Sequence, residues 1–204
     1  MNRARRLRLL LAAWALAVAQ WGCARPMTEA DIVDPQLRAI NQHFTRIIQD
    51  MHDDPHVQWH SGWFGNVLVN YGDTDDQGLC YQWQREVYRR VLPEVQRQGW
   101  AAVGIGKNRR TMSEHHAVIV FDPSRIQPEQ LLNAPRDRPA WVLDGWRRGK
   151  PDIYPLADWI SRTWVQVNPP VLENLDTWAE NATQTPARDV PNVSDAQPIQ
   201  PAVR

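Results

Sequence analysis

One run of seven residues, His115–Phe121, constrains the fold of this 204-residue chain more than any other segment. Its apolar side chains would fall on both faces of an extended strand, Ala117, Ile119 and Phe121 on one face and Val118 and Val120 on the other. A strand that is apolar on both faces is typical of the buried middle of a sheet. We therefore predict that His115–Phe121 is a central strand.

Two long helices are expected before this strand. Asp34 can cap the first, Pro35 suits its first position, and an apolar stripe at helical spacing follows: Leu37, Ile40, Phe44, Ile47, Ile48 and Met51. The second helix is expected at about residues 77–92, with Asp75 or Asp76 as its N-cap and with Pro93 kinking or ending it.

The remaining segments predict short elements. Strands are expected at 100–106, 141–144 and 164–167, and short helices at 155–161 and 171–180. From about Asn181 the chain is rich in proline and has no apolar periodicity, which predicts a disordered tail over 181–204. Together these elements predict one α+β domain over residues 29–180, with the second helix packed on a small antiparallel sheet.

The N-terminus has the composition of a bacterial export signal. A basic stretch, Met1–Arg8, precedes eleven apolar residues, Leu9–Ala19, too few to span a bilayer. Gly22-Cys23 is typical of a lipoprotein signal, so residues 1–22 would be removed and 23–28 would form a linker. Cys23 would then carry lipid and anchor the chain to a membrane, facing the periplasm. Cleavage after Ala19 is the alternative, and would give a secreted or periplasmic protein.

The charge of the exported part argues against one class of partner. The predicted signal contains four arginines and no acidic residue, and without it 19 basic residues face 23 acidic ones, a formal charge of −4. Binding to nucleic acid depends on dense Lys and Arg, so no nucleic-acid partner is expected.

The two cysteines, Cys23 and Cys80, support two exclusive interpretations. If Cys23 carries lipid, Cys80 is a lone thiol in an oxidising compartment, where unpaired thiols are usually avoided unless they are used. If the chain is cut after Ala19, a Cys23–Cys80 disulfide becomes the alternative.

Cys80 would lie near the start of the second helix, His116 at the start of the central strand and Asp144 at the end of a later strand. A thiol reacts as its thiolate, which a helix N-terminus and a neighbouring imidazolium both favour. A carboxylate behind the imidazole fixes its tautomer and its orientation. These three residue types predict a Cys-His-Asp triad.

Three short motifs resemble the papain-like and transglutaminase-like cysteine hydrolases. They are Gly78-Leu-Cys80-Tyr-Gln-Trp83, Glu114-His-His116-Ala-Val-Ile-Val120 and Trp141-Val-Leu-Asp144-Gly-Trp146. The resemblance covers roughly residues 63–161. It implies a papain-like core with Cys80 as nucleophile, Asp144 as the orienting residue and His116 as the base, since Ala-Val follows it; His115 is the alternative base. Gln77 is the candidate partner for an oxyanion. The 28-residue interval from His116 to Asp144 exceeds that of compact members and implies an insertion.

The substrate side is less constrained by the sequence. Trp83 and Trp146 are expected near a cleft, and Arg109 and Arg147 lie on segments that would ring its mouth and favour carboxylates, as in a cell-wall peptide. The predicted activity is hydrolysis or acyl transfer at an amide or peptide bond, with no cofactor. The alternative is a non-catalytic envelope lipoprotein that binds a ligand or partner through a groove lined by some of the eleven tryptophans.

A metal site is not expected. Three histidines, His52, His56 and His60, recur every four residues, as they would on one face of a helix. Pro55 interrupts that helix, so the segment is predicted to be a solvated loop.

Overall fold

The computed structural model describes residues 25–62, 65, 77–111, 113–133, 139–161 and 168–176. The predicted signal peptide with Cys23, the predicted strand at 164–167 and the predicted tail lie outside these ranges. Within them, every helix is too short or too polar to cross a membrane.

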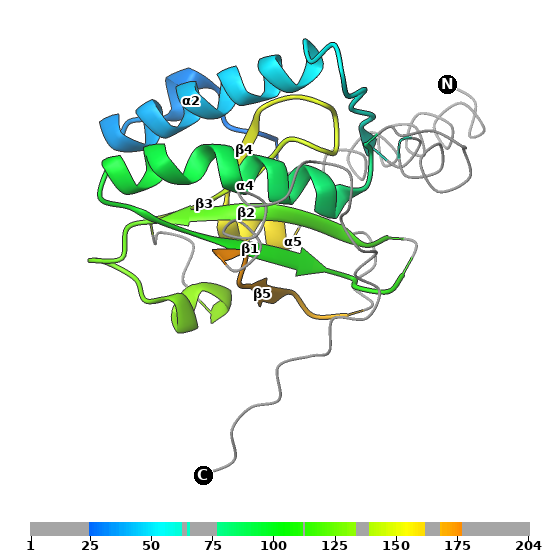
Figure 1. Cartoon of the computed structure of the whole chain (residues 1–204). Coiled ribbons are helices and arrows are strands. Elements are labelled where there is room, and N and C mark those ends of the chain that lie inside the picture. The colour runs from blue at the N-terminus through cyan, green and yellow to red at the C-terminus, as the bar shows by residue number, and fades with distance from the viewer. Residues whose placement is uncertain are drawn as a thin grey trace, which may run out of the picture.

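The described part of the chain is built on a five-stranded antiparallel sheet (Figure 1). Its strands are β1 (Ala101–Lys107), β2 (His115–Phe121), β3 (Ala140–Asp144), β4 (Asp152–Pro155) and β5 (Val171–Glu173), arranged in the order β4-β3-β2-β1-β5. β2 is in the middle of the sheet, and all seven of its residues are buried. The prediction of a central strand is confirmed, and so is the α+β class.

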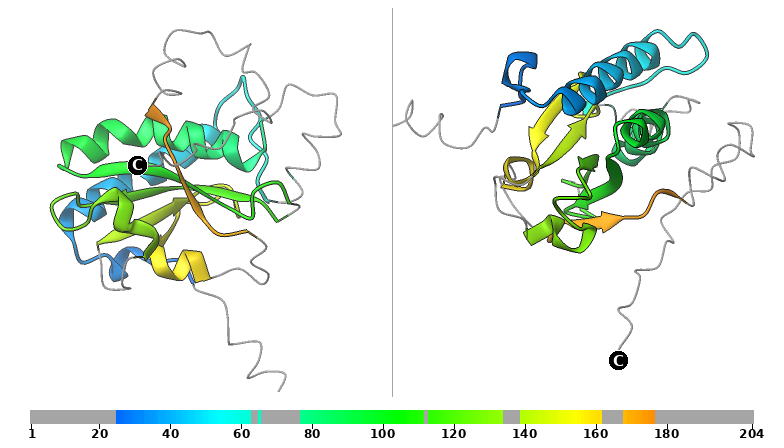
Figure 2. Two further views of the ribbon diagram at one scale, coloured as in Figure 1. Left: turned by 90° about the horizontal axis from the view of Figure 1, so that it is seen from below. Right: turned by 90° about the vertical axis from the view of Figure 1, so that its left-hand side faces the viewer.

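Both faces of the sheet are covered. The long helices α2 (Pro35–His52) and α4 (Cys80–Arg97) lie side by side on one face (Figure 2). The short helix α5 (Leu156–Ser161) and the 3-10 helix η2 (Pro128–Asn133) cover the other, and a 3-10 turn, η1 (Glu29–Asp31), precedes α2. Val118 and Val120 join the core under the long helices, whereas Ala117, Ile119 and Phe121 join the second core. The two faces of β2 therefore belong to two separate cores.

Helix α2 agrees with its prediction in every respect. The Asp34 carboxylate accepts hydrogen bonds from the backbone N–H groups of Gln36 and Leu37 at 2.8 and 3.0 Å. Pro35 occupies the first helical position, where its missing N–H costs nothing. All six residues of the predicted apolar stripe are buried.

Helix α4 begins and ends later than predicted. It starts at Cys80, and the side-chain oxygen of Gln82 accepts from the backbone N–H groups of Gly78 and Leu79 at 3.0 and 2.9 Å. The N-cap position is held by Leu79, so the prediction of Asp75 or Asp76 as the N-cap is wrong; both of these residues lie outside the described ranges. Pro93 does not end the helix. Val91 and Val95 on either side of it are fully buried, and their packing offsets the lost backbone hydrogen bond.

Three further segments differ from expectation. Strand β4 has no counterpart among the predictions, and residues 171–173 form a strand rather than the start of a helix. The expected linker is already part of the fold at Met27, whose N–H donates to the carbonyl of Ile153 at 2.8 Å. Met27 and β5 pair with strands distant in sequence, which local propensity cannot reveal, whereas β4 pairs with β3, the strand directly before it.

Leu143 provides a test of the larger core. This β3 side chain is 1% exposed beneath the long helices. We expect Leu143→Ala to lower the free energy of unfolding by about 2 to 5 kcal/mol, because it leaves a cavity in a packed core. Val33→Ala, at a side chain that is 86% exposed, should change it by less than about 0.5 kcal/mol. Urea unfolding measures both, and equal effects would contradict the assignment of Leu143 to the core.

Candidate active site

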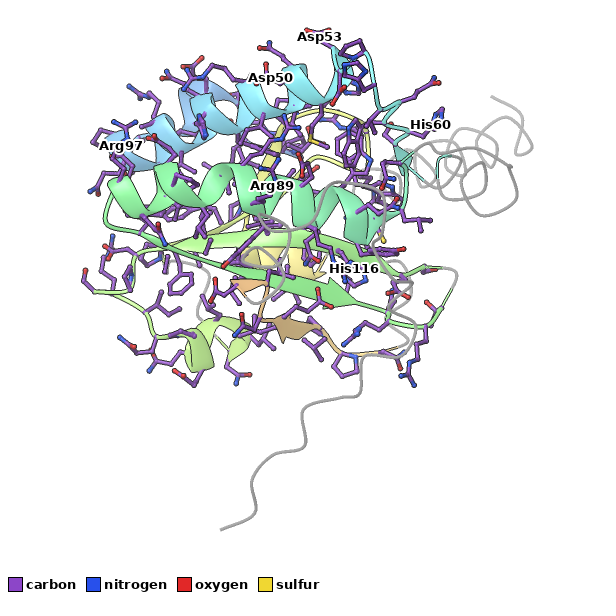
Figure 3. The ribbon with its side chains drawn as sticks, viewed as in Figure 1. Asp50, Asp53, His60, Arg89, Arg97 and His116 are labelled. Atoms are coloured by element: carbon purple, nitrogen blue, oxygen red, sulfur yellow. The ribbon has the colours of Figure 1, made fainter. Side chains whose placement is uncertain are left out.

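Three elements meet at one end of the sheet. Cys80 is the first residue of α4, His115 and His116 are the first residues of β2, and Asp144 is the last residue of β3. Because β2 and β3 are antiparallel, the start of β2 and the end of β3 lie at the same end of the sheet. Figure 3 shows His116 beneath the N-terminal end of α4. The fold thus brings together the residue types that the three motifs supply.

Asp144 binds His115. Its Oδ2 lies 2.7 Å from Nε2 of His115 and also accepts from the indole Nε1 of Trp159 at 2.9 Å. The backbone N–H of Arg147 donates to the other carboxylate oxygen at 3.4 Å. Burial alone would raise the pKa of Asp144, but His115 and the other donors outweigh it and lower the pKa to about 2. The carboxylate is therefore ionised at neutral pH.

The state of His115 follows from this contact. Burial lowers the pKa of His115 and outweighs the opposing effect of Asp144, so the imidazole is neutral at pH 7. An ionised carboxylate only accepts hydrogen bonds, so the ring proton is on Nε2. Nδ1 then carries a lone pair, and it is buried without a hydrogen-bond partner among the described residues. His115 is consequently a base whose free nitrogen is held in one place.

Two tryptophans enclose the His115 ring. The Trp146 ring lies 5.0 Å from it, centre to centre, at 40°, and the Trp159 ring lies 5.3 Å away at 29°. Trp146 also donates from Nε1 to the carbonyl of Gly78 at 2.8 Å, which ties the imidazole to the segment before α4. Trp146 is buried against His115, and its predicted place near a cleft stays a prediction.

His116 does not contact Asp144 but lies between two glutamates. Its Nδ1 is 2.9 Å from Glu173 and its Nε2 is 2.6 Å from Glu114. Burial alone would lower the pKa of His116, but the two carboxylates outweigh it and raise the pKa to about 9. With both nitrogens donating, His116 is an imidazolium at pH 7 and cannot accept a proton.

The choice of His116 as the residue that Asp144 orients is therefore wrong, and His115, the alternative, occupies that position. Successive side chains of a strand point to opposite faces, so only one of two adjacent histidines can reach a given carboxylate. The Ala-Val sequence that follows His116 does not reveal which of the two histidines points toward Asp144.

Glycines in β1 make room for the His116 cluster. A Cβ on Gly106 would lie 2.8 Å from Oε1 of Glu173 and 3.1 Å from Nδ1 of His116, and both are too close. From α4, the side-chain amide of Gln84 donates to the other oxygen of Glu173 at 2.8 Å. These contacts attach β5, which carries Glu173, to the centre of the sheet.

The Cys80 side chain is a free thiol and is only 4% exposed. Cys23, its alternative disulfide partner, lies outside the described residues. The sulfur donates to the backbone carbonyl of Glu114 at 3.8 Å, beside the backbone of His115, rather than to either imidazole. Burial raises the pKa of Cys80 to about 12, and the carboxylates of Glu114 and Glu173 add to this effect. The expected lowering by the helix N-terminus is outweighed, so the resting thiol is protonated.

Trp83 and Gln77 do not have the surroundings that were predicted for them. Trp83 is a core residue, 1% exposed, with Nε1 donating to the carbonyl of His60 at 2.7 Å, so its assignment to an open cleft is wrong. Gln77 pairs through its main chain with Gln58 and His60, and no contact of its side chain supports a role with an oxyanion.

The two arginines lie close to the site. The Arg109 side chain is half-exposed and lies 3.6 Å from Glu173. Arg147 follows the Asp144 segment directly and contacts it through its backbone N–H. Their role in binding a substrate stays a prediction.

Three residues of the site were not predicted: Glu114, Trp159 and Glu173. Glu114 precedes the histidines directly, so its position was a usable signal. Trp159 and Glu173 reach the site only through folding, and nothing in their local sequence marks them.

Among the described residues, no group of three or more His, Cys, Asp and Glu side chains is arranged to hold a metal ion. Of the regularly spaced histidines, His52 donates from Nε2 to the main-chain carbonyl of Gly149 at 2.8 Å. His52 and His56 also line an open, polar pocket of about 520 Å³ together with Asp54, Gln58 and Trp59.

Comparison with known proteins finds no relative, since no family model, curated protein or solved structure matches this chain. The resemblance to cysteine hydrolases therefore depends on the three motifs alone.

The His116 cluster predicts a loss of stability at alkaline pH. The pKa of His116 is about 9 in the folded chain against an ordinary value of 6.5, so its contribution is complete below pH 6.5 and disappears as the pH rises to 9. The expected loss is on the order of 3 kcal/mol, at about 1.4 kcal/mol per pKa unit. Urea unfolding at several pH values between 6 and 9.5 measures it.

His116→Gln is the matched control for this prediction. The variant should be less stable at pH 6, and its free energy of unfolding should vary little between pH 6.5 and 9. Parallel pH profiles for the wild type and the variant would show that His116 is not the group responsible.

Proposed function

We propose that this chain is a cysteine hydrolase or acyl transferase acting on an amide or peptide bond. Cys80 is the nucleophile, His115 the general base and Asp144 the residue that orients His115. The observation that carries the proposal is the unpartnered, buried Nδ1 of His115, whose opposite nitrogen is fixed by Asp144. This nitrogen has no hydrogen-bond partner among the described residues, and a general base needs a free lone pair of this kind.

The protonated thiol decides the order of events. With a pKa of about 12, Cys80 holds its proton until the substrate is bound. Nδ1 of His115 accepts this proton as the sulfur attacks the carbonyl carbon, and Asp144 stabilises the imidazolium that forms. His115 then returns the proton to the leaving amine as the C–N bond breaks and a thioester remains. Water or an acceptor amine, deprotonated by His115, breaks the C–S bond and restores the thiol.

This mechanism requires contact between the sulfur and Nδ1 during reaction. In the resting structure the thiol bonds the Glu114 carbonyl instead. Hydrogen bonds between catalytic groups are often long without substrate and tighten in the complex. Closure requires Sγ to leave the core beneath α4, to which Cys80 belongs, and to reach a ring that stacks on Trp159 of the second core.

The same proposal extends to the fold family, the localisation and the substrate of the protein. The core is papain-like or transglutaminase-like, with the nucleophile at the start of α4. The chain is exported, and is held at a membrane by lipid on Cys23 or released into the periplasm by cleavage after Ala19. Arg109 and Arg147 favour a substrate with carboxylates, and a cell-wall peptide satisfies this requirement.

A second candidate function is binding without catalysis. The observation in its favour is the Cys80 thiol itself, which is buried and strongly disfavours the anion. In this alternative the ligand occupies the open pocket next to Trp59, whose wall also includes His52 and Gln58. The tryptophan-lined groove expected from the sequence would then be this pocket.

Alkylation of Cys80 by iodoacetamide at pH 7, followed by mass spectrometry of the intact protein, separates the two functions. If His115 is the base, His115→Gln and Asp144→Asn should each slow the reaction by about 10²-fold or more, the typical contribution of a general base. His116→Gln should slow it by less than about tenfold, because His116 cannot accept a proton.

Two results would contradict catalysis by this site. One is a wild-type Cys80 that stays unmodified under conditions that label the urea-unfolded chain. The other is an equal rate in the wild type and in His115→Gln. Either result would leave binding as the function to pursue.

A further inference from the structure

One oxygen of Asp144 accepts two side-chain hydrogen bonds. Its Oδ2 receives Nε2 of His115 at 2.7 Å and the indole Nε1 of Trp159 at 2.9 Å. Both donors and the carboxylate are buried. The indole therefore shares the charge that orients the base.

Lys107 of β1 fixes the indole in turn. Its ammonium donates to the main-chain carbonyl of Trp159 at 2.9 Å and lies 3.9 Å from the centre of the indole ring. Lys107 is itself buried, which is uncommon for an ammonium group and shows how closely α5 is held to the sheet. The indole N–H thus approaches Asp144 from a rigid position.

Trp159 also stacks on the imidazole that Asp144 binds, at 5.3 Å and 29°. One side chain therefore contacts both members of the pair, the carboxylate through its N–H and the imidazole through its ring face. Trp146 contacts only the imidazole, because its own N–H binds Gly78.

We propose that Trp159 is a positioning residue of the His115–Asp144 pair: its indole N–H holds the Asp144 carboxylate toward His115 and so keeps the His115 lone pair on Nδ1. The meaning of this role for catalysis rests on the proposed cysteine chemistry. The effect of Trp159 on the pKa and tautomer of His115 does not depend on that chemistry, and it is measurable without any substrate.

The physical reason is competition for one oxygen. A second donor on Oδ2 disperses the carboxylate charge and limits rotation of the carboxyl group. Without it, the full charge acts on His115 and favours the imidazolium. The other charged groups acting on His115 are Lys107 of β1 and Arg147 after β3, both of which disfavour the imidazolium and are unchanged by the loss of the indole N–H.

Long-range ¹H–¹⁵N NMR of the histidine rings during a pH titration tests the proposal. In the wild type, His115 should hold its proton on Nε2 and titrate below 6.5. Trp159→Phe keeps an aromatic ring and removes the donor, and we expect the His115 pKa to rise by about one unit. Trp146→Phe is the matched control, since it trims the other ring on His115 and removes a donor that does not bind Asp144; it should leave the tautomer and pKa unchanged.

A second measurement uses the wild-type protein alone. The Trp159 indole proton, which is bound to Asp144, should shift more than the Trp146 indole proton as His115 titrates. This comparison keeps the proposal testable even if Trp159→Phe does not fold.

The outcomes separate the two proposals. Equal His115 pKa shifts in the two tryptophan variants, or none in Trp159→Phe, would overturn the role of Trp159 whatever Cys80 does. A shift confined to Trp159→Phe supports that role even if Cys80 proves inert, which would count against the cysteine hydrolase only. In a reactive protein, the pH midpoint of Cys80 alkylation should move with the His115 pKa in Trp159→Phe and stay in place in Trp146→Phe.

Discussion

The hydrogen bond between His115 and Asp144 is the interaction on which this end of the molecule depends. A buried carboxylate is costly unless donors surround it, and here three elements supply them: β2 through His115, α5 through Trp159 and the turn after β3 through Arg147. Satisfying one charge therefore fixes the relative positions of a strand, a helix and a turn. The same contacts leave Nδ1 of His115 buried and without a hydrogen-bond partner among the described residues.

The two adjacent histidines show how neighbours decide protonation. His115 meets one carboxylate, which it shares with an indole, and burial keeps it neutral. His116 meets two carboxylates, Glu114 and Glu173, and it is a cation. Because the strand turns them to opposite faces, the first can act as a base while the second fastens β5 to the sheet. Two adjacent histidines therefore differ in protonation state and in the contacts that they make.

Much of this arrangement is readable from the sequence, and the rest has specific physical reasons for being hidden. Alternation and helical spacing are local, so they give β2 and α2 correctly, and the ends of strands place Asp144 near the histidines. The choice between His115 and His116 depends on sheet register. The protonation of Cys80 depends on how deeply α4 packs, and β5 depends on partners about 70 residues away in β1. None of these is encoded within a short window.

The imidazole of His115 lies between two indole rings that are themselves tied down, Trp146 to the segment before α4 and Trp159 to Asp144 and Lys107. A half-turn of this ring about its Cβ–Cγ bond would require both flanking planes to separate and the bond to Asp144 to break. The ring is therefore locked against flipping as well as against tautomeric exchange. Any proton that this histidine gives up or takes must pass through Nδ1, which is itself buried, because Nε2 is held by Asp144.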